Sequence, residues 1–159
     1  MTSQQHPPAA ATGPATSIAP TAHVVCPVDE LPPGERKIVT VAGRSIGVFN
    51  VGGRYYALRN ACPHRVAPLC EGRVRGLVVS NGPYDVRVER EGEIVACPWH
   101  GWEFDITTGR SHFNPHRLRV KTYEVTVGMA TACTDDGDPA VETFTVTVKR
   151  NTVLLHVTG

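Results

Sequence analysis

Two short stretches of this chain each place one cysteine and one histidine within a predicted tight turn. They are Cys62-Pro63-His64 and Cys97-Pro98-Trp99-His100-Gly101. Proline after each cysteine restricts the backbone and removes an N–H donor, and glycine at the end of the second stretch permits a positive φ. Thiolate and imidazole groups are common ligands of transition metals. We therefore predict a metal site made by Cys62, His64, Cys97 and His100.

Two sulfur and two nitrogen ligands suit either of two metal groups. One is a tetrahedral zinc ion, and the other is a Rieske-type [2Fe–2S] cluster, in which two histidines replace two cysteines on one iron. Zinc motifs typically place about two residues between paired cysteines and about three to five between paired histidines. Here each stretch supplies one cysteine and one histidine instead. This arrangement favours the cluster and leaves a zinc-stabilised binding module as the alternative.

The second stretch continues as Cys97-Pro98-Trp99-His100-Gly101-Trp102-Glu103-Phe104-Asp105 and runs on to Gly109. Together with Cys62-x-His64, it resembles the Rieske ferredoxins and is similar to the N-terminal domains of Rieske oxygenases. The resemblance covers roughly residues 23–127 and then the terminal strands. It implies one [2Fe–2S] cluster, with both cysteines on one iron and both histidines on the other.

One feature departs from the family pattern. His64 and Cys97 are separated by 32 residues, about twice the separation in most family members. We interpret residues 72–90 as an inserted hairpin with a turn at Asn81-Gly82-Pro83 and an added strand at Tyr84–Glu89. Such a hairpin would leave both ligand loops intact.

The resemblance also bears on the reduction potential. Quinol-oxidising Rieske proteins carry a disulfide between the two loops and serine and tyrosine hydroxyls near the cluster. The matching positions here are Ala67, Trp99, Trp102 and Phe104. Hydrogen bonds to the sulfurs stabilise the reduced cluster, so their loss lowers the potential. We expect a value in the lower part of the Rieske range of roughly −150 to +300 mV.

The segments that flank these two loops are predicted to be β-strands. Thirteen prolines and fifteen glycines favour a turn-rich β protein, and no convincing amphipathic helical window occurs. The predicted strands are His23–Val28, Lys37–Val41, Ser45–Asn50, Tyr55–Arg59, Tyr84–Glu89, Glu93–Ala96, Trp102–Ile106, Arg117–Val127, Thr143–Lys149 and Val153–Val157. Turns are expected at Glu91-Gly92 and Arg150-Asn151, and loops at Gly72–Pro83 and Gly128–Val141.

These strands predict an all-β Rieske fold of stacked antiparallel sheets. Residues 23–159 would form one domain, with a base from 23–58 and 113–159 and a cluster-binding subdomain at about 59–112. Residues 1–22 contain no Asp, Glu, Lys or Arg. We expect them to be a disordered tail, because they offer little apolar surface to bury.

Bulk properties exclude several kinds of partner. The net charge of +1 indicates no nucleic-acid partner, and no apolar run approaches the roughly 18 residues of a membrane span. The N-terminus has neither a basic nor an apolar leader segment. Five widely scattered cysteines argue against a disulfide scaffold, so we expect a cytoplasmic protein with metal-bound thiolates.

The resemblance implies a ferredoxin that takes single electrons from a reductase and passes them to an oxygenase. The alternative is a small Rieske subunit of a larger oxidoreductase, either nitrite-reductase-like or an oxygenase component. Residues 113–159 are too few for the second, iron-containing domain of a Rieske oxygenase, so we expect no catalysis by this chain alone. Trp99, Pro68 and Trp102 are candidates for an apolar collar around exposed histidine tips, with core positions as the alternative for both tryptophans. His112 and His116 are candidates for the cluster face.

Overall fold

The computed structural model describes residues 21–133 and 147–157, so residues 1–20, 134–146 and 158–159 lie outside the described part. The end of the predicted tail at 21–22 is wrong, because Thr21 and Ala22 belong to the first strand and pair with Val157 and His156. The described residues form nine strands and two short 3-10 helices. The strands are β1 Thr21–Pro27, β2 Arg36–Val41, β3 Arg44–Val51, β4 Arg54–Arg59, β5 Arg73–Gly82, β6 Asp85–Ala96, β7 Glu103–Asp105, β8 Thr122–Cys133 and β9 Thr147–Val157, and the 3-10 helices are η1 Val28–Glu30 and η2 Leu69–Glu71.

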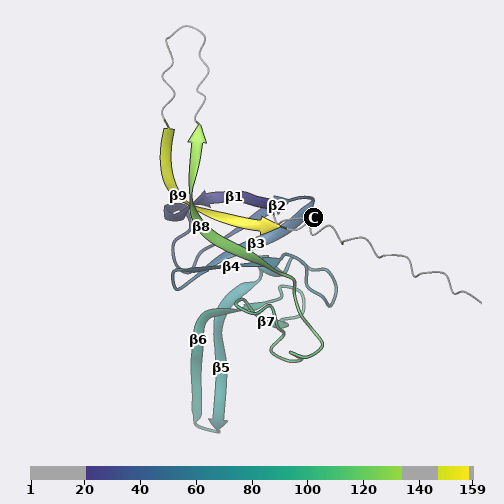
Figure 1. The fold of residues 1–159 in the computed structure, drawn as a ribbon. Coiled ribbons are helices and arrows are strands. Elements are labelled where there is room, and N and C mark those ends of the chain that lie inside the picture. Colours follow the sequence, from purple (N-terminus) through teal and green to yellow (C-terminus); the bar gives the residue numbers. More distant parts are fainter. Residues whose placement is uncertain (1–20, 134–146, 158–159) are drawn as a thin grey trace, which may run out of the picture.

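Two antiparallel sheets contain all of these strands. The larger sheet has six strands in the order β1-β9-β8-β4-β3-β2, and the smaller has three in the order β5-β6-β7. Figure 1 shows the β5–β6 hairpin projecting from one side of the larger sheet, while the outer parts of β8 and β9 project from the other. The prediction of an all-β fold with stacked antiparallel sheets is confirmed.

Strands β3 and β4 separate two hydrophobic cores. Alternate side chains of a strand point to opposite faces, so Val48 and Ala57 enter a core with the β1 and β9 residues, whereas Phe49 and Leu58 enter the other core. The second core also contains Cys62, and it lies against the smaller sheet through residues such as Val95 and Phe104. The ligand loops are therefore anchored on the face of the larger sheet that carries this second core.

Two predictions about the segment between the ligand loops are wrong. Residues 73–82 form strand β5 rather than a loop, and most residues of β5 pair with β6. Glu91-Gly92 is no turn, because β6 runs through it to Ala96. The register shifts opposite this point, and Arg90 and Gly92 have φ values of 53° and 76°, so the feature is a β-bulge. The hairpin itself is confirmed by the pairing of β5 with β6, and its being an insertion stays a prediction.

The C-terminal strands also differ from the prediction. Strand β8 begins at Thr122 and continues to Cys133, so the first part of the predicted loop at 128–141 is strand. Asn151 pairs with Met129 inside β9, and the predicted turn at Arg150-Asn151 is wrong. A Gly or Asn in a strand mimics a turn signal, but the long antiparallel pairing of β8 with β9 overrides it. The first residues of the predicted strand 143–149 lie outside the described part.

Within the described residues, no helix has the length and apolar character needed to cross a membrane.

Candidate metal centre

The first ligand loop follows strand β4 and closes on itself through backbone hydrogen bonds. The Cys62 N–H donates to the Ala67 carbonyl over 2.8 Å, and the Val66 N–H donates to the Cys62 carbonyl over 2.8 Å. Val66 closes this loop with a φ of 57°. The bonds hold Cys62 inside the loop, while His64 lies at its exposed tip.

The second ligand loop directly follows strand β6 and has the same pattern of backbone hydrogen bonds. The Cys97 N–H donates to the Trp102 carbonyl over 2.8 Å, and the Gly101 N–H donates to the Cys97 carbonyl over 2.9 Å. Gly101, with a φ of 69°, takes the place that Val66 has in the first loop. The two loops therefore have the same pattern of backbone hydrogen bonds and face each other. Each has a buried cysteine and an exposed histidine.

The two cysteines lie together in the second hydrophobic core. Cys62 and Cys97 are only 1% and 3% exposed. Burial raises the pKa of the Cys62 thiol, and the neighbouring Cys97 thiol raises it further, while the backbone N–H groups of His64 and Arg65 act in the opposite direction. The same N–H groups would stabilise negative charge on a metal-bound sulfur.

The two histidines form a second pair on the outside of the loops. The ring centroids of His64 and His100 lie 4.7 Å apart, with an angle of 69° between the ring planes. Both residues are exposed. The predicted ligands are thus sorted into an inner pair of thiols and an outer pair of imidazoles. A [2Fe–2S] cluster with one iron on sulfur and one on nitrogen fits this arrangement.

No group of three or more His, Cys, Asp or Glu side chains gathers around one point within the described residues. Each iron of a Rieske cluster takes only two protein ligands, and the other bonds go to the bridging sulfides. The observed pairing suits that division.

The pairing of β5 with β6 joins the two loops at their bases. The segment that leaves the first loop enters β5, where Arg73 pairs with Ala96, the residue just before Cys97. Gly72 passes so close to this point that a Cβ atom there would overlap the Ala96 carbonyl oxygen. The ligand loops are therefore fixed relative to each other through backbone.

The larger sheet also holds the segment after the first loop. The Arg36 guanidinium on β2 donates hydrogen bonds to the carbonyl oxygens of Gly72 and, over 3.2 Å, of Glu71. Nearby, the Cys70 N–H donates to the Asn60 side-chain oxygen over 2.7 Å. These contacts tie the ligand loop to the base.

The two tryptophans have different surroundings. Trp99 is 60% exposed, so it belongs to the surface beside His100 and not to the core. Trp102 is half-buried and packs against the core that contains both cysteines. Its indole ring is stacked on the His64 imidazole, with ring centroids 4.3 Å apart and an angle of 5° between planes. Pro68 is half-buried.

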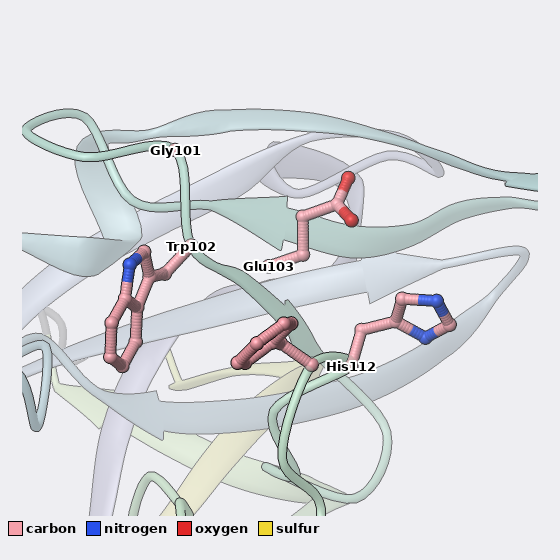
Figure 2. A pocket seen from close by; sticks show the side chains of 5 residues that line it. Gly101, Trp102, Glu103 and His112 are labelled. Carbon is pink, nitrogen blue, oxygen red and sulfur yellow. The ribbon is translucent and has the colours of Figure 1, made fainter.

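A hollow of about 450 Å³ opens beside the second loop, lined by Gly101, Trp102, Glu103, His112 and Phe113. Figure 2 shows the Trp102 ring on one side of this hollow and His112 on the other. His112 thus lies near the second ligand loop, whereas His116 does not line this hollow. A role of either histidine at the cluster face stays a prediction. The sequence analysis missed Phe113, which is 87% exposed, because nothing in the sequence distinguishes an exposed aromatic residue in a loop from a buried one.

The other two cysteines with described side chains, Cys26 and Cys70, are buried free thiols. Cys70 packs in the same core as Cys62 and Cys97, whereas Cys26 lies in the core on the other face of the larger sheet. Burial raises the pKa of Cys70 to about 12, so this residue stays protonated. The side chain of Cys133 lies outside the described part.

Comparison with known proteins gives a consistent result. The family model of the Rieske [2Fe-2S] domain matches residues 21–124, which include both ligand loops. The ferredoxin component of the naphthalene 1,2-dioxygenase system of Pseudomonas aeruginosa is 32% identical over 98 residues, covering 62% of this chain and 79% of that protein.

Two solved structures have a similar fold. The ferredoxin of carbazole 1,9a-dioxygenase from Nocardioides aromaticivorans IC177 superposes with a TM-score of 0.56 at 25% identity, over 85% of this chain and 96% of that one. A chain from a complex of reduced oxygenase and oxidized ferredoxin in carbazole 1,9a-dioxygenase gives a TM-score of 0.51 at 27% identity, over 67% of this chain and 93% of that one.

Two facing loops, each with a buried cysteine and an exposed histidine, fit an iron–sulfur protein of the Rieske type. The chain belongs to the Rieske [2Fe-2S] domain family. Its cofactor is one Rieske-type [2Fe–2S] cluster.

Proposed function

We propose that this chain is an electron-transfer ferredoxin that passes single electrons from a reductase to an oxygenase. Cys62 and Cys97 would hold the inner iron of the cluster, and His64 and His100 the outer iron. The observation that carries this proposal is the sorting of the four side chains into a buried thiol pair and an exposed imidazole pair. When bound, the cluster supplies one-electron redox chemistry.

The exposed histidines offer a short route between the cluster and a partner protein. Their rings lie at the surface, and the apolar residues Val66 and Trp99 beside them are 77% and 60% exposed. An apolar rim of this kind can be desolvated when a partner docks, which brings the two redox groups close together. The naphthalene dioxygenase ferredoxin and the carbazole dioxygenase ferredoxin serve oxygenase systems, and this supports an oxygenase as the acceptor.

The surroundings of the site support a low reduction potential. Phe104 and Trp102 occupy the positions where a high-potential Rieske site has hydroxyl donors, and Phe104 is completely buried. Neither ring can donate an O–H hydrogen bond to a cluster sulfur, so the reduced state gains less stabilisation. This favours a donor to an oxygenase over an acceptor from quinol.

We also infer that the protein works in the cytoplasm. Cys26 and Cys70, which are not among the proposed ligands, are free thiols, and free thiols are typical of a reducing compartment such as the cytoplasm.

The function can be tested with the purified holoprotein in two arms. In the first, potentiometric titration should show uptake of one electron per chain at a potential in the lower part of the Rieske range. In the second, the reduced protein is mixed with the oxygenase of the naphthalene 1,2-dioxygenase system, and the oxidised protein is mixed with decylubiquinol. We expect rapid reoxidation by the oxygenase and no reduction by the quinol. A high potential together with rapid reduction by the quinol would contradict the proposal.

A further inference from the structure

We propose that Trp102 is a positioning residue for the metal site: its indole ring sets the orientation of the His64 imidazole across the gap between the two ligand loops. The inference rests on the proposed function only in taking His64 as a ligand of the cluster. It assigns to Trp102 a role beyond filling the core.

The indole ring of Trp102 lies flat against one face of the His64 imidazole. The two rings are parallel within 5°, with their centroids 4.3 Å apart, so the indole covers one face of the imidazole. A tilt toward the indole would bring the two rings into overlap, and a tilt away would lose the stacking contact, so the parallel orientation is favoured. A tilt would also turn the nitrogen lone pair, which lies in the ring plane, away from a metal. The His64 ring also meets the His100 ring, with centroids 4.7 Å apart and an angle of 69° between the planes.

Trp102 is itself held in place by the backbone of the second loop and by the hydrophobic core. Trp102 immediately follows Gly101, and its carbonyl accepts the hydrogen bond from the Cys97 N–H that closes the second loop. Its side chain packs against the core that contains both cysteines. The second loop therefore orients a ligand that belongs to the first loop, and the relative position of the two loops is transmitted to the His64 ring.

Trp99 lacks these properties although it belongs to the same loop. Its ring centroid is 6.4 Å from that of His100, with an angle of 77° between the planes, and 60% of the residue is exposed. Such an edge contact leaves the His100 ring free to tilt. Trp99 is thus a matched control for the loss of a tryptophan near a ligand histidine.

The test compares three variants of the holoprotein: Trp102→Leu, which keeps apolar bulk without a ring; Trp102→Phe, which keeps a ring; and Trp99→Leu. Each is labelled with 15N-histidine and reduced. The readouts are the g values, the 15N hyperfine couplings of the two ligand histidines, and the half-life of the visible cluster spectrum. Groups that orient metal-bound histidines typically change metal affinity about 10-fold or more when removed.

We expect Trp102→Leu to shift the 15N coupling of one histidine only, to change the g values, and to lose the cluster about 10-fold faster than the wild type. Trp102→Phe should restore the wild-type couplings and most of the half-life, and Trp99→Leu should match the wild type throughout.

Wild-type couplings and half-life in Trp102→Leu would overturn the positioning role. Failure of Trp102→Phe to restore a cluster that Trp102→Leu has lost would also overturn it, because bulk rather than the ring would then be what matters. These outcomes differ from failure of the proposed function, which would be seen in the wild-type protein itself as a high potential with rapid reduction by the quinol.

Discussion

Val66 closes the first ligand loop in a backbone conformation that valine rarely adopts. Its φ is 57°, and Gly101 has the equivalent place in the second loop. A left-handed conformation costs an L-residue roughly 1–2 kcal/mol, and the cost is highest for a β-branched side chain. Valine is retained there with 77% of its surface exposed, next to the exposed His64. This is consistent with a contact role for the side chain at the rim of the site.

Replacing Val66 with glycine should relieve this strain. We expect Val66→Gly to raise the free energy of unfolding by about 1 kcal/mol, because little buried surface is lost and glycine accepts a positive φ. The measurement is the thermal midpoint of the holoprotein. Val24→Gly is the control, since Val24 is similarly exposed within strand β1, and glycine there should lower stability by about 0.5–1 kcal/mol. Equal losses in both variants would contradict the assignment of strain.

Asp105 connects the loop after β7 to the bulge in β6. Burial raises the pKa of this carboxyl, but hydrogen bonds from Thr107 and Arg90 outweigh burial and hold the pKa below its ordinary value. Arg90 reaches both Asp105 and Glu93 over 2.6 Å. The positively charged bulge residue therefore joins two segments of the smaller sheet.

The pH dependence of stability follows from that lowered pKa. A carboxyl with a depressed folded-state pKa stabilises the protein above its ordinary pKa and loses this contribution as the pH falls through the folded value. We expect Asp105→Asn to lower the free energy of unfolding by about 1 kcal/mol at pH 7, and the difference from wild type to shrink below about pH 4. Denaturant unfolding at both pH values measures it, and a difference that stays constant would contradict the role of the charge.

At the scale of the elements, the β5–β6 hairpin has two parts with different roles. Its base joins the two ligand loops, because Arg73 pairs with Ala96 where the first loop ends and the second begins. Its outer part projects from the larger sheet (Figure 1). The valines Val78, Val86 and Val88 of this part are exposed. Sequence changes should therefore matter at the base far more than at the tip.

Two glycines of the hairpin allow a direct test. A Cβ at Gly72 would overlap the Ala96 carbonyl, while a Cβ at Gly82 meets no atom within 4 Å. We expect Gly72→Ala to lower the free energy of unfolding by about 2 kcal/mol or more and to speed loss of the cluster. Gly82→Ala should stay within about 0.5 kcal/mol of wild type. Similar behaviour of the two variants in thermal unfolding and cluster retention would contradict the joining role of the base.

The same hairpin shows how far sequence reasoning extends. The ligand loops could be predicted because their chemistry is local: each cysteine and its histidine lie within four residues of each other. The bulge at Arg90 and Gly92 could not be told from a turn, because both use residues with positive φ. The stacking of Trp102 on His64 joins two loops 38 residues apart, and no pattern in the sequence reveals which ring faces which. Such contacts depend on the packing of two sheets.

At the scale of the whole molecule, the protein consists of a larger sheet that bears the smaller one across a shared core. The core between them contains Cys62 and Cys97, so the contacts that bury the site also hold the two sheets together. Arg36 adds a polar connection, because it reaches from β2 of the larger sheet to the backbone carbonyls of Glu71 and Gly72. Loss of this connection should weaken the attachment of the smaller sheet and the ligand loops to the larger sheet.

Neighbouring residues on β2 make this prediction measurable. We expect Arg36→Met to lower the free energy of unfolding by about 1–3 kcal/mol, since two carbonyl groups lose a charged donor. Lys37→Met removes only an exposed ion pair with Glu30, and it should change stability by less than about 1 kcal/mol. Thermal unfolding and the visible spectrum should report the same loss in Arg36→Met. An effect no larger than that of Lys37→Met would show that the apolar core alone joins the two sheets.

Cys62, His64, Cys97 and His100 are the four residues that we propose as ligands of the Rieske cluster. The most direct measurement is electron paramagnetic resonance of the reduced protein labelled with 15N-histidine, in the wild type and in His64→Cys and His100→Cys. We expect a Rieske spectrum with two nitrogen couplings in the wild type, and loss of that spectrum in both variants. A wild-type protein that is colourless and binds one zinc ion, or a Rieske spectrum that survives either substitution, would contradict it.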